Sequence, residues 1–193
     1  MKLKHISHLI TGSVMELFGV MADGKVVNSY ELTNKRGAKL KVINYGATVT
    51  SLKIPLKSGE MVDVVLGFDT LENYINSFDL ESAPYLGATV GRYAGRINNA
   101  TFNLNGEIIH LDKNNNGHSL HGGKDNFSKK VWEVKNVNEG CSPSITFGYL
   151  SPANEGNYPG DLSVELTYTL SENNELIIEY NAQTTEDTVL NLT

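Results

Sequence analysis

Polar and apolar residues alternate with a two-residue period along most of this chain, a pattern typical of half-buried β-strands. The clearest case is DLSVELTYTL, residues 161–170, where five apolar side chains alternate with five polar ones. A second alternating run, residues 175–182, follows after SENN, and Asn173 and Asn174 suit the positive φ angles of a tight turn. The two runs together predict a β-hairpin.

A second hairpin is predicted in TFNLNGEIIHL, residues 101–111, because Asn105-Gly106 is the preferred pair for a type I′ turn. Weaker alternating runs predict further strands, which lie at residues 40–44, 48–54, 64–68, 132–137 and 145–150. Many short strands separated by Gly, Asn and Asp turns predict an all-β fold with an antiparallel sandwich or barrel. We expect a single domain over residues 1–193.

One stretch indicates a helix. In DTLENYINS, residues 69–77, Asp69 is placed to cap the first turn and Glu72 follows three positions later, as in a capping box. The segment predicts one or two helical turns, so the fold contains little helix.

Composition narrows the classes of partner. The chain has 16 Lys and Arg residues against 22 Asp and Glu residues, a net charge of −6 without long runs of either sign, which argues against nucleic acid and membrane partners. The first 20 residues contain no uninterrupted apolar region of the kind found in signal peptides, and a cytoplasmic location fits. Cys141 is the only cysteine, so neither an internal disulfide nor a thiolate metal cluster can form.

Two histidines stand three positions apart in GHSLHGG, residues 117–123. The flanking glycines argue against a helix, and residues three apart on an extended segment point to opposite faces, so both imidazoles cannot easily bind one metal ion. One histidine can face a pocket. The Gly-Gly pair favours His121 for that position because it lets backbone approach a ligand closely, whereas His118 and His121 could also be turn residues bonded to nearby carbonyls.

Two arginines, Arg92 and Arg96, lie among small residues in GATVGRYAGRINNATF, residues 87–102. Small neighbours leave space in front of a guanidinium, whose fixed fork of donors can span adjacent oxygens such as those of a sugar. Pairing with surface carboxylates is the alternative for each arginine. The carboxylates themselves show no spacing that marks an acid and a base, and EGNYPGD, residues 155–161, is typical of a turn.

Taken together, these segments resemble the aldose 1-epimerases, also called galactose mutarotases. The likeness runs from about Phe18 to the last residue, in the order found in the family. The matching segments are residues 43–55, 63–74, 87–97, 119–127, 157–170 and 188–193. The resemblance implies a large antiparallel β-sandwich of the galactose mutarotase type, no metal or organic cofactor, and interconversion of the α and β anomers of free hexoses such as galactose and glucose.

The resemblance also implies roles for particular residues. Arg96 matches the family arginine that binds sugar hydroxyls, and His121 matches the histidine that hydrogen-bonds near the ring oxygen, so both bind and orient the hexose. Gly95 stands where the family commonly has Asn, which removes or replaces one side-chain contact to the sugar. No role is implied for His118.

The family's proposed general acid is a histidine immediately after the Asn-Leu-Thr matched by residues 191–193, and its catalytic glutamate lies farther along. By resemblance this chain is therefore the N-terminal portion of a mutarotase sandwich, with the C-terminal portion absent. It holds sugar-binding residues and no catalytic residue, so the isomerase activity belongs to the complete protein and the 193-residue chain alone is expected to be inactive. The alternative is a truncated, non-catalytic or vestigial sugar-binding domain. An interrupted sheet would expose an edge, which predicts pairing with the missing C-terminal part or self-dimerisation.

Overall fold

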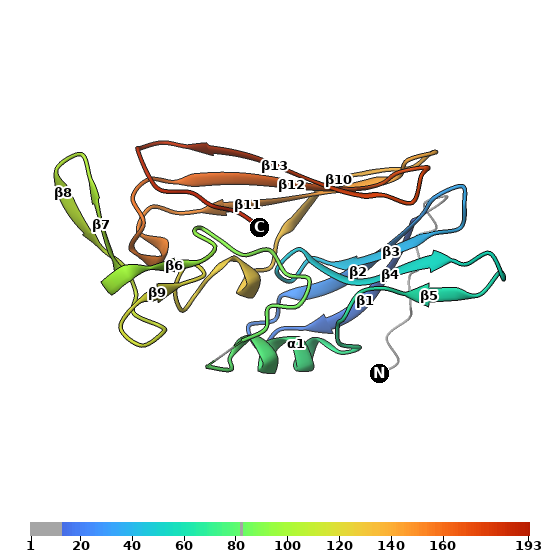
Figure 1. Cartoon of the computed structure of the whole chain (residues 1–193), viewed down its shortest axis with the longest axis horizontal. Helices are drawn as coiled ribbons and strands as arrows, with labels where there is room; N and C mark the ends of the chain where they lie inside the picture. The colour runs from blue at the N-terminus through green and yellow to red at the C-terminus, as the bar shows by residue number, and fades with distance from the viewer. Residues whose placement is uncertain (1–12, 82) are drawn as a thin grey trace.

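The computed structural model describes residues 13–81 and 83–193, whose longer strands form two antiparallel sheets stacked face to face (Figure 1). The first sheet contains, in spatial order, β1 (Ser13–Val20), β2 (Val26–Thr33), β3 (Lys39–Ile43), β4 (Thr48–Pro55) and β5 (Met61–Asp63). The second contains β10 (Glu133–Asn138), β11 (Ser144–Ser151), β12 (Leu162–Leu170) and β13 (Leu176–Thr184). The predicted antiparallel sandwich is confirmed.

The main core lies between these sheets. The alternation in residues 161–170 corresponds to β12, whose apolar members are 0–2% exposed while their neighbours face outward. They meet inward residues of β2, β3 and β4, among them Leu32 and Leu40, both fully buried. Burial of apolar surface on both inner faces is the main stabilising term of such a sandwich. β1 and β2, which the sequence pattern did not predict, complete the first sheet.

The helix α1 (Leu71–Phe78) covers the outer face of the first sheet, where Tyr74 and Phe78 are buried (Figure 1). The prediction of a short helix is confirmed, but its capping residue was wrong. The N-cap is Thr70, which is extended and whose hydroxyl accepts the backbone N–H of Asn73 at 3.3 Å. Asp69 lies one residue too early for that bond.

The strand predicted at residues 64–68 is also wrong. The ladder ends at Asp63, and residues 64–68 have no strand. The Asp63 carboxylate accepts the backbone N–H groups of Leu52 (3.0 Å) and Val65 (3.1 Å) and the hydroxyl of Ser51 (2.5 Å). A side chain thus takes over backbone donors that a further strand would have paired.

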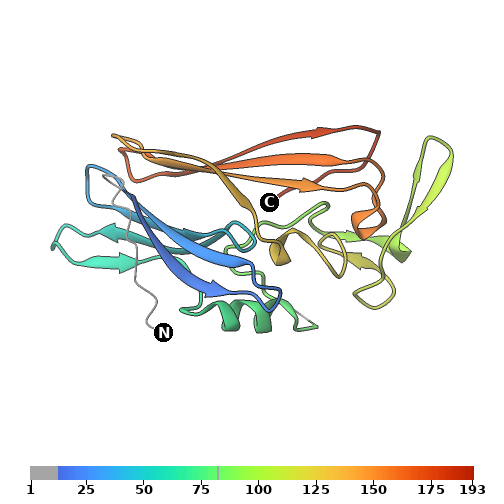
Figure 2. The same cartoon turned by 180° about the vertical axis from the view of Figure 1, so that it is seen from behind.

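Smaller elements gather at one end of the sandwich. β6 (Arg96–Ile97) pairs with β9 (Ser119–Leu120), and the hairpin of β7 (Thr101–Leu104) and β8 (Glu107–His110) projects beside them (Figure 2). Three 3₁₀ turns complete the described part: η1 (Asn98–Ala100), η2 (Phe127–Lys129) and η3 (Glu155–Asn157). The Asn105-Gly106 hairpin is confirmed, with φ of 53° and 90°.

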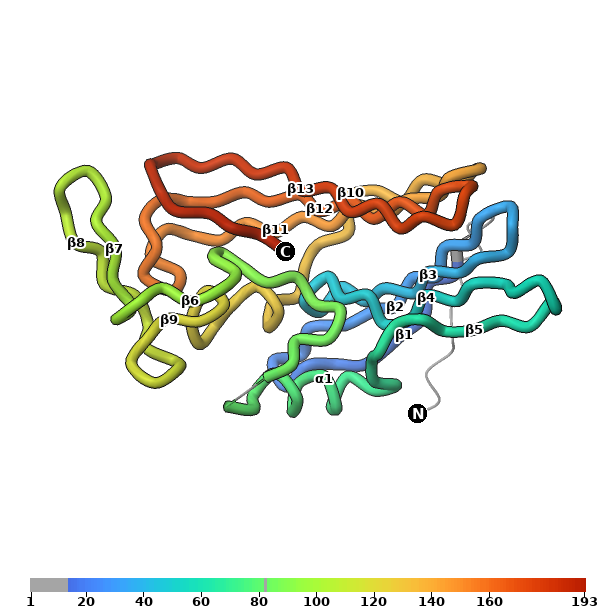
Figure 3. Tube along the Cα trace, viewed as in Figure 1, coloured from blue at the N-terminus to red at the C-terminus, as the bar shows by residue number. Residues whose placement is uncertain are grey.

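After β13 the chain turns at this same end, and its last residues run back toward the middle of the sandwich (Figure 3). The Asn191 N–H donates to the carbonyl of Arg92 at 3.0 Å, and Thr193 exchanges hydrogen bonds with Val90. β13 is an edge strand of the second sheet, and its consecutive residues Ile177 and Ile178, which point to opposite faces of the strand, are 42% and 48% exposed. Within residues 13–81 and 83–193, no helix has the length and apolar character needed to cross a membrane.

Candidate functional site

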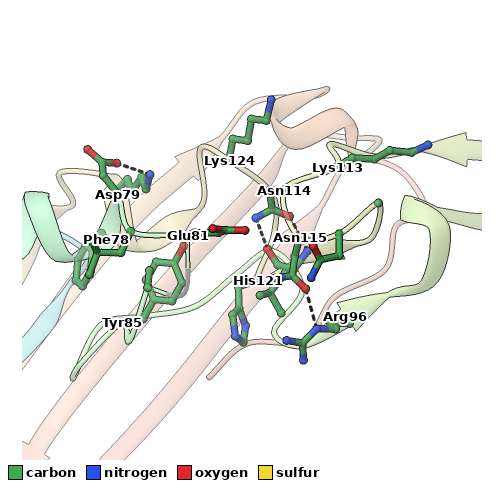
Figure 4. Close-up of a pocket in the computed structure, with 17 residues that line it drawn as sticks. Phe78, Asp79, Glu81, Tyr85, Arg96, Lys113, Asn114, Asn115, His121 and Lys124 are labelled. Carbon is green, nitrogen blue, oxygen red and sulfur yellow. Dashed lines mark hydrogen bonds and ion pairs between the residues drawn. The ribbon is translucent and has the colours of Figure 1, made fainter.

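A cavity of about 530 Å³ opens at the end of the sandwich where the small strands gather. One wall is formed by the end of α1, at Phe78, and by the segment that follows it, which includes Tyr85. The other wall is the turn of residues 113–117 together with Arg96 and His121 (Figure 4). Most of these residues lie on loops held by a rigid sheet framework, the usual setting of a binding site.

Arg96 reaches the cavity from β6, directly opposite Leu120 of β9. Its Nε donates to Oδ1 of Asn115 at 3.1 Å. The side chain is exposed, and within the described residues its two terminal amino groups have neither a hydrogen-bond acceptor nor an ion-pair partner. The neutral Asn115 amide therefore orients the guanidinium while leaving its fork of donors and its charge available to a ligand.

The turn carrying Asn115 is fixed by its neighbour. The Asn114 side chain accepts the Leu120 N–H at 2.8 Å and donates to the Leu120 carbonyl at 2.9 Å, as a neighbouring strand would do. Asn116 and Gly117 form the tip, both with positive φ, 46° and 84°. The run of three asparagines, a visible but unused signal in the sequence, thus builds the support beside Arg96.

His121 follows β9 and is joined to Gly95 by two hydrogen bonds. The His121 N–H donates to the Gly95 carbonyl at 3.0 Å, and the Gly95 N–H donates to Nδ1 of the imidazole at 3.1 Å. Because Nδ1 is an acceptor, the neutral ring carries its proton on Nε2 and offers a donor. Burial, and then the charge of Arg96, lower the pKa of His121 from 6.5, which favours this neutral form.

The glycines around His121 have different functions. A Cβ on Gly122 would overlap the carbonyl oxygen of Gly91, so this position brings two backbone segments into contact. A Cβ on Gly95 would meet no atom within 4 Å, so Gly95 leaves open space beside Arg96 and His121. The φ of 104° at Gly95 is also strained for any residue with a side chain.

Gly95 and the other two candidates from the sequence, His118 and Arg92, are not among the residues that line the cavity. His118 accepts the backbone N–H of Asn99 through Nδ1 at 3.0 Å, which secures η1. Arg92 is 2% exposed, and all five of its N–H donors reach acceptors at the end of β11 and on the turn that leads to β12. Those acceptors are the Ser151 hydroxyl and the carbonyls of Ser151, Pro152, Pro159 and Gly160. Arg92 therefore anchors a turn and has no donor left for a ligand.

Several cavity residues were missed by sequence reasoning, namely Tyr85, Glu81, Lys113 and Lys124. They come from segments without strand or helix periodicity, so no pattern placed them at one site. Described carboxylates on the lining are Asp79, which is paired with Lys129 at 2.6 Å, and Glu81, which is exposed. In the part of the chain that the structure describes, no cluster of three or more His, Cys, Asp or Glu residues could hold a metal ion.

Comparison with known proteins gives one consistent result. The family model described as aldose 1-epimerase matches residues 28–193. Galactose mutarotase of Bos taurus is 41% identical over 155 residues, which are 80% of this chain and 42% of the relative. Aldose 1-epimerase of Haemophilus influenzae is 37% identical over 175 residues, or 89% of this chain and 47% of the relative. The chain thus spans about half the length of the curated relatives it matches.

Solved structures agree. The crystal structure of galactose 1-epimerase from Lactobacillus acidophilus superposes with a TM-score of 0.80 at 26% identity, covering 93% of this chain and 51% of that one. An aldose epimerase homologue from C. elegans gives a TM-score of 0.74 at 35% identity, covering 84% and 47% of the two chains. The sandwich fold of this chain is therefore shared with these proteins.

Proposed function

The chain belongs to the aldose 1-epimerase family, and we propose that it forms the sugar-binding wall of an isomerase that interconverts the anomers of a free hexose. The observation that carries this proposal is the set of donors in the cavity. Arg96 offers two terminal amino groups and neutral His121 offers its Nε2 proton, from positions fixed by Asn115 and Gly95. Ring and hydroxyl oxygens of a sugar are matching acceptors.

Anomer interconversion requires a proton at the ring oxygen while a base removes the proton of the C1 hydroxyl, after which the ring closes on the other carbonyl face. In our proposal the His121 Nε2–H binds near the ring oxygen and the Arg96 fork spans adjacent hydroxyls. Both residues orient the hexose, such as galactose or glucose, without transferring its protons. The space at Gly95 accepts the part of the sugar that a side chain would otherwise contact. The reaction itself needs no redox step or covalent intermediate.

We propose that the acid and base lie outside these 193 residues, in a longer protein. Neither described carboxylate on the cavity lining is bonded to His121: Asp79 is paired with Lys129, and no hydrogen bond or ion pair joins Glu81 to His121. Residues 191–193 run along residues 90–94, which lead into Arg96. In our proposal, residues that follow Thr193 in a longer protein continue from beside Val90 to the cavity.

The same proposal assigns a partner to the second sheet. β13 has a strand neighbour on one side only among the described residues, and Ile177 and Ile178, on its two opposite faces, are exposed. A further part of a longer protein, or a second copy of this chain, would satisfy that edge.

Two measurements on the 193-residue chain test the function. NMR titration with galactose should shift the backbone signals of residues 95–96 and 113–121, and Arg96→Ala should remove most of the shift while His118→Ala should preserve it. Polarimetry on fresh α-D-galactose should show only the spontaneous rate of mutarotation, because no proton-transfer pair is in place.

Each outcome has a separate meaning. Acceleration of mutarotation by the pure chain would show that it holds its own acid and base, against the proposal that these lie elsewhere. The lack of any galactose shift at the cavity would contradict the sugar site. Binding without acceleration supports the proposal, and the same two results for protein isolated from its natural source at 193 residues would favour a non-catalytic sugar-binding domain.

A further inference from the structure

We propose that Tyr85 is a positioning residue that fixes the orientation of the His121 imidazole in the sugar site, an inference that rests on the proposed function above. Neither the sequence pattern nor the family resemblance assigned a role to Tyr85. The evidence consists of a ring contact, a hydroxyl tether and two strained backbone positions, which converge on the same side chain (Figure 4).

The Tyr85 ring forms a wall against one edge of the imidazole. The centroids of Tyr85 and His121 are 5.6 Å apart with an interplanar angle of 77°, an edge-to-face arrangement. On its other side Tyr85 packs against Phe78 at 5.4 Å, and Phe78 stacks on Tyr45 at 5.8 Å. Because Phe78 and Tyr45 are 1% and 3% exposed, the wall behind His121 is continuous with the buried cluster under α1.

The Tyr85 hydroxyl is tethered to the segment that carries His121. It accepts Nδ2 of Asn126 at 2.9 Å, and Asn126 is 1% exposed. The same amide donates weakly to the carbonyl of Gly123 at 3.4 Å and accepts the N–H of Ser128 at 3.1 Å. Asn126 therefore links the tyrosine to Gly123, two residues beyond His121, so the ring wall and the histidine segment are held in one network.

The backbones of both partners lie in the left-handed region, with φ of 46° at Tyr85 and 54° at His121. Residues with a side chain adopt this region at a cost and keep it where surrounding contacts impose it, which occurs preferentially at functional sites. The Tyr85 carbonyl closes a turn by accepting the Ala88 N–H at 3.1 Å. Two strained residues thus direct their rings toward each other across the cavity wall.

The consequence concerns the imidazole proton. The Gly95 N–H selects the tautomer with the proton on Nε2, but a single bond leaves the ring able to rotate about its Cβ–Cγ bond. The Tyr85 ring blocks that rotation, and among the described residues its hydroxyl is bonded to Asn126 and to neither imidazole nitrogen. Together the two contacts keep the Nε2–H donor free for a ligand.

The test is the ¹⁵N NMR spectrum of His121 in the 193-residue chain, with Tyr85→Leu, Tyr85→Phe and the control Tyr180→Leu on β13. The native ring should show one dominant tautomer, with well-separated Nδ1 and Nε2 signals. In Tyr85→Leu we expect these signals to move toward averaged values and the galactose-induced shift at His121 to fall about fivefold. Tyr85→Phe keeps the ring but removes the hydroxyl that bonds to Asn126, and we expect the galactose-induced shift at His121 to fall about twofold. Tyr180→Leu should leave the His121 ¹⁵N signals and the galactose-induced shift unchanged.

The readouts separate this inference from the proposed function. If galactose shifts nothing in the native chain, the sugar site fails while the tautomer signals still report on Tyr85. A folded Tyr85→Leu variant with native His121 signals would overturn the positioning role. If Tyr85→Leu does not fold, Tyr85→Phe decides: native signals and a native galactose shift would refute the tether, and a change at His121 alone would support it.

Discussion

The same dipeptide, Gly-Arg, occurs at residues 91–92 and again at 95–96, and the two copies have opposite surroundings. Gly91 is crowded, because a Cβ there would lie 2.5 Å from the Phe127 ring and 2.8 Å from Leu192, whereas Gly95 faces open space. Arg92 is buried with all its donors bonded to the chain, and Arg96 is exposed with its fork free.

The difference shows that the surroundings of a guanidinium decide whether its donors bond to the chain itself or stay available to a ligand. A guanidinium becomes structural where backbone carbonyls converge on it, and those around Arg92 come from the end of β11 and the following turn, about 60 residues later in the chain. It stays available where a single neutral acceptor holds Nε, as Asn115 does for Arg96. Local sequence looks alike in the two cases because the deciding partners are distant.

The largest effect is expected for Arg92→Ala. The substitution leaves a cavity and removes the donors of four buried or part-buried carbonyls, so the free energy of unfolding should fall by at least about 3 kcal/mol. Arg92→Lys should keep only part of the free energy of unfolding that Arg92→Ala loses, because an ammonium has three donors in place of five. Urea unfolding measures both. A loss below about 1 kcal/mol for Arg92→Ala would contradict the anchoring role.

The glycines provide the next comparison. Gly91→Ala must displace Phe127 or Leu192 in packed surroundings, which we expect to cost about 1–3 kcal/mol of unfolding free energy. Gly95→Ala meets no atom, so its cost is limited to the positive φ, about 1 kcal/mol. Thermal unfolding of the two variants under one condition checks the order. A larger loss at Gly95 than at Gly91 would reverse the comparison.

The sequence predicted features that depend on neighbouring residues and missed features that depend on distant ones. Alternation predicted the hairpin of β12 and β13 because the two strands are consecutive and each has one buried face. The turn at Asn105-Gly106 was predicted because these two residue types readily adopt the positive φ angles that it needs. The strand at 64–68 failed because one side chain, Asp63, replaced a ladder. The resemblance singled out Arg96 and His121, but Asn115 and Tyr85 became visible only when the fold brought four separate segments together.

A smaller effect is expected from pH. The pKa of His121 is lowered by burial and then by the charge of Arg96, so as pH falls below 6.5 the unfolded chain binds a proton before the folded chain does. The free energy of unfolding therefore decreases toward lower pH in this window. Arg96→Ala should raise the His121 pKa toward 6.5, whereas substituting His118 should not alter it. NMR titration of His121 gives the values, and an unchanged pKa in Arg96→Ala would contradict the coupling.

The smallest effect on stability is expected for Arg96→Ala, although its effect on binding should be the clearest. An exposed side chain with one hydrogen bond, to Asn115, contributes little to folding, and we expect a change within about 0.5 kcal/mol. Galactose binding should be lost, because the two terminal amino groups of Arg96, which are unbonded among the described residues, are the groups proposed to bind the sugar hydroxyls. Isothermal titration and urea unfolding on the same sample separate the two quantities. A stability loss comparable with that of Arg92→Ala would mean that Arg96 is structural as well, and the contrast between the two Gly-Arg pairs would disappear.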